Sequence, residues 1–180
     1  MAKGKWAQGI PPRDFKWVIK DKFAICEKLG GYGEQHRAVR RQEEVIWVRE
    51  RRFRYVISLQ PGDDLSGYDE LGVRWKHWPL PLAGEPDAIL GAIYTELQKL
   101  IRNDSPILVH MEEVSDRLAG FIGGYLVFTG MVPEVSESIQ LTERLMERPL
   151  GPAGRQMITA ASRIIAENAG SQDVDAESAS

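Results

Sequence analysis

Residues 107–129, which read ILVHMEEVSDRLAGFIGGYLVFT, decide the fold. Residues 107–110 are a short apolar run, which predicts a buried central strand. Residues 118–129 are apolar nearly all round, which predicts a buried helix. The polar stretch 111–117 is then a loop at the carboxyl end of a central strand, where open α/β sheets bind ligands. Its backbone N–H groups and the positive end of the helix favour an anion there.

Around this unit, the chain alternates short apolar strands with amphipathic helices. Composition and spacing predict strands at 15–19, 23–26, 55–59 and 73–78, one helical turn at 66–71, and helices at 34–51, 85–102, 133–147 and 153–166. This order predicts an α/β fold with a central, mostly parallel sheet flanked by helices.

The chain has 180 residues, of which 43% are hydrophobic and 27% charged, the balance of a single globular domain. We expect a flexible N-terminal arm over 1–14, the domain over 15–168, and a disordered acidic tail over 169–180. No apolar run approaches the roughly 20 residues that span a bilayer, and no apolar stretch follows the N-terminus as in a signal peptide. We therefore expect a cytoplasmic protein without membrane contact.

Cysteine and histidine are too few for a metal site or a disulfide. Cys26 is the one cysteine, and its apolar surroundings predict a small buried residue. His36, His77 and His110 are widely spaced, so we expect no metal and no other cofactor.

Charge is unevenly distributed along the chain. Residues 1–60 contain 14 Lys and Arg against 7 Asp and Glu, so they carry +7, whereas the other 120 residues carry −10. Such asymmetry can mark a nucleic-acid surface, but no aromatic-basic RNA-binding signature accompanies it. We interpret the basic residues as solvated helix faces and do not expect nucleic-acid binding.

Several fragments, in their order and spacing, resemble the cysteine-based dual-specificity branch of the protein tyrosine phosphatases. The resemblance covers about residues 15–165. It rests on Val56-Ile57-Ser58-Leu59, Tyr68 through Trp78-Pro79-Leu80-Pro81, Ile107-Leu108-Val109-His110 with Arg117, Gly124-Tyr125-Leu126, Glu137-Ser138-Ile139, and Arg148-Pro149 with Gln156. It implies a phosphatase-like fold whose signature loop is His-Cys, five residues, then Arg.

The residues that the resemblance assigns to catalysis are replaced here. Met111 stands at the nucleophile position, six residues before Arg117, and a thioether cannot ionise as the attacking thiolate must. Leu82 stands at the position of the general acid, for which Glu85 or Asp87 could substitute. Val114 and Leu118 replace the family's usual Gly and Ser or Thr.

These departures predict a catalytically inactive phosphatase-like protein, a pseudophosphatase, that serves as a binding or regulatory module. Its partner would be a protein, such as an active phosphatase or that phosphatase's substrate. The resemblance places the binding site at His110, Glu112, Glu113, Ser115, Asp116 and Arg117. Three carboxylates around one arginine oppose a phosphate, so we do not expect phosphate binding. We expect instead that Glu112 or Glu113 turns inward and occupies the anion pocket, and that His110 orients the loop through hydrogen bonds.

Two alternatives stay open on the sequence. The chain could be an active phosphatase or another hydrolase that uses a carboxylate such as Asp116 or Glu113 in place of the thiolate. It could also bind nucleic acid through its basic N-terminal third, with an affinity that falls steeply with salt.

Overall fold

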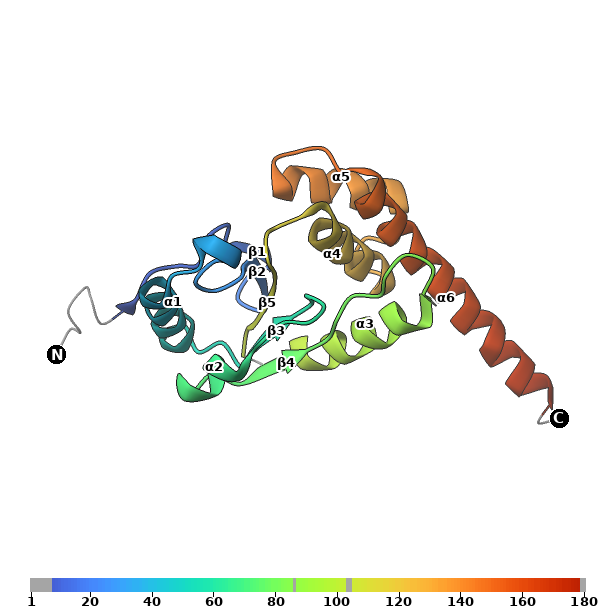
Figure 1. Ribbon diagram of the computed structural model, residues 1–180. Helices are drawn as coiled ribbons and strands as arrows, with labels where there is room; N and C mark the ends of the chain where they lie inside the picture. Colours follow the sequence, from blue (N-terminus) through green and yellow to red (C-terminus); the bar gives the residue numbers. More distant parts are fainter. Residues whose placement is uncertain (1–7, 86, 103–104, 179–180) are drawn as a thin grey trace. The chain divides into compact units, whose positions relative to one another are not determined.

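The computed structural model describes residues 8–85, 87–102 and 105–178 (Figure 1). Within 15–168, where the sequence predicts one domain, the contacts distinguish two compact units. The first unit contains the residues up to 80 together with 99–115, and the second contains 81–98 and the residues from 116 onward. No helix in the described part of the chain is both long enough and apolar enough to cross a membrane.

The first unit is built on a five-stranded sheet with the strand order β1-β2-β5-β3-β4. The strands are β1 (Lys16–Ile19), β2 (Phe23–Glu27), β3 (Tyr55–Ser58), β4 (Trp75–His77) and β5 (Ile107–Met111). β1 runs antiparallel to β2, and every other pair is parallel. Every residue of β5 is buried, as expected for a continuous apolar run at the centre of a parallel sheet. The predicted α/β class, the mostly parallel sheet and its central strand are confirmed.

Two helices of the first unit pack on the sheet. Helix α1 (Ala38–Glu50) contributes Val45 and Val48 to the core that contains Val56 and Leu108, and the short α2 (Ser66–Glu70) contributes Tyr68. Helix α1 begins four residues later than its charge and apolar pattern predicts. The two residues before it are extended, and a 3-10 turn at 33–35 precedes them.

The second unit is helical. It contains α4 (Asp116–Phe128), α5 (Val135–Met146), α6 (Pro152–Ser178) and most of α3 (Asp87–Ile101). Helix α4 is buried from residue 118 to 127, as its apolar circumference predicts. Side chains of α3 and α5 bond to its backbone carbonyls: the Tyr94 hydroxyl donates to Phe121 O at 3.0 Å, and the Ser138 hydroxyl donates to Gly123 O at 2.8 Å.

The two ends of the chain differ from the predicted arm and tail. Residues 1–7 lie outside the described residues, but Ile10 N–H donates to Glu43 O at 3.2 Å, Glu27 N–H donates to Arg13 O at 3.0 Å, and Pro12 is buried. The disordered tail predicted from 169 is wrong as far as Ser178, because α6 continues to that residue (Figure 1). A growing helix gains one hydrogen bond for each residue that it fixes, so an acidic, weakly apolar composition does not end it.

Candidate functional site

The segment at residues 107–117 has the predicted order of strand, loop and helix. Strand β5 includes Met111, one residue more than predicted, and α4 begins at Asp116, two residues earlier than predicted. The loop is therefore confined to 112–115. It belongs to the first unit together with β5, whereas Asp116 and Arg117 belong to the second.

Met111, at the position of the family's nucleophile, is the last residue of β5 and is 6% exposed. The Ser115 hydroxyl lies 3.9 Å from its sulfur atom and makes a weak hydrogen bond to it. The sulfur carries a methyl group and no proton, so it cannot become an anion at any pH. A nucleophilic displacement at phosphorus through this side chain is excluded by its chemistry.

His110 precedes Met111 and is fully buried. Its Nε2 lies 3.4 Å from the Tyr68 hydroxyl. Within the described residues its Nδ1 has no hydrogen-bond partner. Burial lowers the pKa of His110 to about 4, although the nearby Asp63 carboxylate partly opposes this effect. The imidazole is therefore neutral at physiological pH.

A partly buried polar cluster, which was not predicted from the sequence, lies at the carboxyl ends of the strands beside His110. Asp63 accepts hydrogen bonds from the Lys28 ammonium and, at 2.6 Å, from the Ser58 hydroxyl. Burial alone would raise the pKa of Asp63, but the bonds from Lys28 and Ser58 outweigh it, and its pKa is lowered. Lys28 follows β2 and Asp63 lies shortly after β3. A signal was therefore available: both are charged residues that follow apolar strands.

The acidic residues of the loop face solvent. Glu112 and Glu113 are both exposed, and Glu113 accepts a hydrogen bond from the Tyr32 hydroxyl at 3.4 Å. The expectation that one of them turns inward to fill the anion pocket is wrong. A carboxylate keeps its hydration at the surface, and burial in the pocket would have required partners strong enough to replace that water.

Asp116 has a structural role in the second unit. Its Oδ1 accepts the N–H of Gly151 at 2.7 Å, and its Oδ2 accepts the N–H of Gly154 at 2.6 Å. These N–H groups lie at the start of α6, where a helix leaves its first amides without internal partners. A carboxylate at this end also interacts favourably with the helix dipole. Both oxygens of Asp116 are thus engaged.

Replacing Asp116 by alanine is expected to lower the free energy of unfolding by about 2 kcal/mol, because two helix-start amides lose a charged acceptor. Urea unfolding followed by circular dichroism measures the change. Asp87→Ala is the matched control. Its carboxylate pairs at 2.9 Å with the half-exposed Arg163, and a surface pair of that kind contributes at most about 1 kcal/mol. Equal losses in the two variants would contradict the structural role of Asp116.

Within the second unit, Arg117 lies beside the loop that the sequence resemblance aligns with the general-acid loop of the phosphatases. The Arg117 guanidinium donates to Pro81 O at 2.7 Å. Leu82, at the acid position, is 58% exposed, and its N–H donates to the Glu85 carboxylate. Arg117, Leu82 and Glu85 line a cavity of about 360 Å³ together with Asp87, Gln156 and Arg163. Of the two acids that could replace the missing one, Glu85 is bound to a backbone amide and Asp87 to Arg163.

Cys26 is fully buried in β2, as predicted. Burial, with a smaller contribution from Glu44, raises the pKa of its thiol well above the ordinary value. The thiol is therefore protonated at neutral pH and is shielded from substrate. Among the described residues, no group of three or more His, Cys, Asp and Glu side chains could hold a metal ion.

Comparison with solved structures places this architecture among known folds. The kinase-associated phosphatase KAP, with serine in place of its catalytic cysteine, is 16% identical, with a TM-score of 0.65 over 82% of this chain and 92% of that one. The catalytic core of the PP-IP phosphatase Siw14 from S. cerevisiae, in complex with citrate, is 16% identical, with a TM-score of 0.61 over 89% and 95%. A single-residue variant of human DUSP28 is 13% identical, with a TM-score of 0.60 over 88% and 99%.

By sequence, no protein-family model and no curated protein matches the chain. At these low sequence identities, the structural matches show the fold alone. They agree with the fold that the resemblance in the sequence implies. The chain has the fold of the dual-specificity and protein tyrosine phosphatases.

Proposed function

We propose that this chain is a catalytically inactive phosphatase-like protein that acts as a binding or regulatory module. The observation that carries the proposal is Met111, a buried thioether at the position where the related enzymes use a thiolate. The one cysteine of the chain is no substitute, since Cys26 is buried and protonated. The fold persists without the chemistry, because stability depends on the core and catalysis on the site.

The carboxylate alternative finds little support in the geometry. A nucleophilic carboxylate needs a free oxygen directed at the substrate, whereas both oxygens of Asp116 accept backbone N–H groups. Glu113 is exposed and accepts a hydrogen bond from Tyr32, so bulk water stabilises its charge and reduces its reactivity. A hydrolase built on either residue would first have to break these interactions.

The activity test compares the unmodified chain with Met111→Ser on a generic aryl phosphate. We expect equal rates at the background level, because neither side chain ionises at neutral pH. We expect the double variant Met111→Cys with Leu82→Asp to exceed Met111→Ser with Leu82→Asp by less than tenfold. Val114 still stands where the family usually has glycine, and Glu112 and Glu113 still repel a phosphate dianion. Turnover by the unmodified chain well above that of Met111→Ser would refute the proposal.

The binding part of the proposal concerns a protein partner, namely an active phosphatase or its substrate. It is tested by affinity capture with the immobilised chain, followed by titration of each captured protein in purified form. A phosphatase or phosphoprotein that binds in the purified titration supports the regulatory role. If no purified candidate binds, the chain does not act through such a partner.

A further inference from the structure

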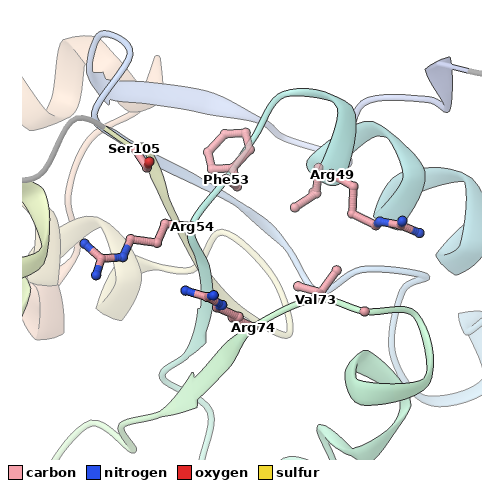
Figure 2. A pocket seen from close by; sticks show the side chains of 8 residues that line it. Arg49, Phe53, Arg54, Val73, Arg74 and Ser105 are labelled. Carbon is pink, nitrogen blue, oxygen red and sulfur yellow. The ribbon is translucent and has the colours of Figure 1, made fainter.

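A cavity of the first unit lies at the amino ends of β3 and β4 (Figure 2). The cluster of Lys28, Asp63 and His110 lies at the opposite, carboxyl ends of the strands. The volume of the cavity is about 390 Å³. Arg49 comes from the end of α1, Phe53 and Arg54 from the connection between α1 and β3, Arg74 from the residue before β4, and Ser105 from the approach to β5. All of these residues belong to one compact unit.

The charge of this cavity is of one sign. Three arginines line it, and no aspartate or glutamate among residues 8–85, 87–102 and 105–178 does. Within the described residues, none of the three guanidinium groups has a carboxylate or any other hydrogen-bond acceptor as a partner. Arg54 lies over the ring of Tyr55 at 5.5 Å, a contact that leaves its N–H donors available. Arg40, from the same basic run, instead binds Glu44 at 2.6 Å. The cavity thus collects cations for which the described residues supply no counter-charge.

The backbone beneath these side chains is firmly held. Arg54 N–H donates to Pro106 O at 2.8 Å, and Arg74 O accepts the N–H of Val56 at 3.0 Å. The Phe53 ring is stacked against Trp17, with ring centroids 5.6 Å apart and an interplanar angle of 15°. The side chains therefore project from a preformed frame, which reduces the conformational entropy that a ligand must remove.

The geometry points to a binding site for the polyphosphate group of a small molecule. Arginine binds phosphate through paired N–H donors, and one phosphate cannot engage several separate guanidinium groups equally well. In Figure 2 the side chains of Arg54 and Arg74 extend to the same side and that of Arg49 to the opposite side, so a ligand that engages all three must carry two or more linked phosphates. The volume lies within the range of small-molecule sites. This site is independent of the Met111 loop and of the inactivity proposed for it.

Isothermal titration calorimetry with sodium tripolyphosphate and with ATP, at low salt and without magnesium, tests the assignment. We expect saturable binding that Arg54→Gln with Arg74→Gln weakens at least tenfold. The matched control, Arg51→Gln with Arg52→Gln, removes the same charge from neighbouring residues that do not line the cavity, and we expect less than a threefold effect. Circular dichroism establishes that both double variants are folded.

The two ligands distinguish the source of the phosphates. Equal affinities for tripolyphosphate and ATP would mean that the phosphate groups alone account for binding. A higher affinity for ATP would mean that its base or sugar also contacts the site, for example the ring of Phe53. Three results would overturn the assignment: no binding of either ligand at millimolar concentration, equal losses in the two double variants, or binding of a single-stranded oligonucleotide without binding of polyphosphate. The last two would indicate a diffuse basic surface or a nucleic-acid surface.

Discussion

Gly120→Ala is expected to lower the free energy of unfolding by about 3 kcal/mol. A Cβ atom at residue 120 would lie 2.5 Å from the Gly154 Cα and 2.6 Å from its carbonyl oxygen. Both are backbone atoms of α6, so no side-chain rotation relieves the overlap, and α4 and α6 must move apart. Overpacking of this kind typically costs about 1–3 kcal/mol, and the rigid neighbour places this variant at the upper end.

Gly170→Ala is the matched control, since it makes the same substitution within α6 at a position where a Cβ would meet no atom within 4 Å. It should raise the free energy of unfolding by about 0.5–1 kcal/mol, because alanine loses less backbone entropy than glycine in a helix. Urea unfolding of the two variants measures the decrease expected for Gly120→Ala and the increase expected for Gly170→Ala. A stability of Gly120→Ala equal to that of the unmodified chain would show that the helices do not cross so closely.

The second large effect is a loss of stability in mild acid. The folded chain holds His110 with a pKa of about 4, against about 6.5 in the unfolded chain. As the pH falls from 6.5 towards 4, His110 binds a proton in the unfolded state but stays neutral in the folded state. The free energy of unfolding therefore decreases across this pH range and becomes constant below pH 4. The difference corresponds to a loss of about 3 kcal/mol. Urea unfolding at a series of pH values measures it.

Two variants isolate the contribution of His110. His110→Asn should be less stable at pH 7 but should lose most of the pH dependence between 6.5 and 4. His36→Asn, which changes a partly exposed histidine, should keep that dependence. Asp63 affects stability at lower pH than His110 does. Because its pKa is lowered in the folded state, the stability that its charge contributes is lost only as the pH falls below the ordinary carboxyl range. An unchanged pH profile in His110→Asn would contradict the assignment to His110.

Much of the fold could be predicted from local pattern. The run at 107–110 is apolar without interruption, and only the centre of a sheet buries both sides of a strand. The apolar circumference of 118–129 likewise admits only a buried helix. The boundaries were less predictable, since α1 starts late and α6 runs on to Ser178. Helix ends depend on local backbone geometry and elongation, which periodicity does not report.

The chemistry of the candidate site could also largely be predicted from the sequence, but the interaction partners of its residues could not. The thioether of Met111 excludes thiolate attack whatever surrounds it. The sequence does not reveal that Asp116 binds the start of α6, 35 and 38 residues away, or that Glu113 turns to Tyr32. A charged residue in a loop has many possible partners, and the choice among them is made only when distant segments pack together.

The sequence by itself determined the class of fold, the central strand and the absence of a thiolate at its end, because each follows from the covalent nature and periodicity of neighbouring residues. Only the tertiary structure decided which groups meet. It placed the partly buried Lys28–Asp63 pair beside a neutral His110, brought Gly120 against Gly154, and gathered Arg49, Arg54 and Arg74 around one cavity. These encounters join residues far apart along the chain, and their energies depend on burial and distance, which no local pattern contains.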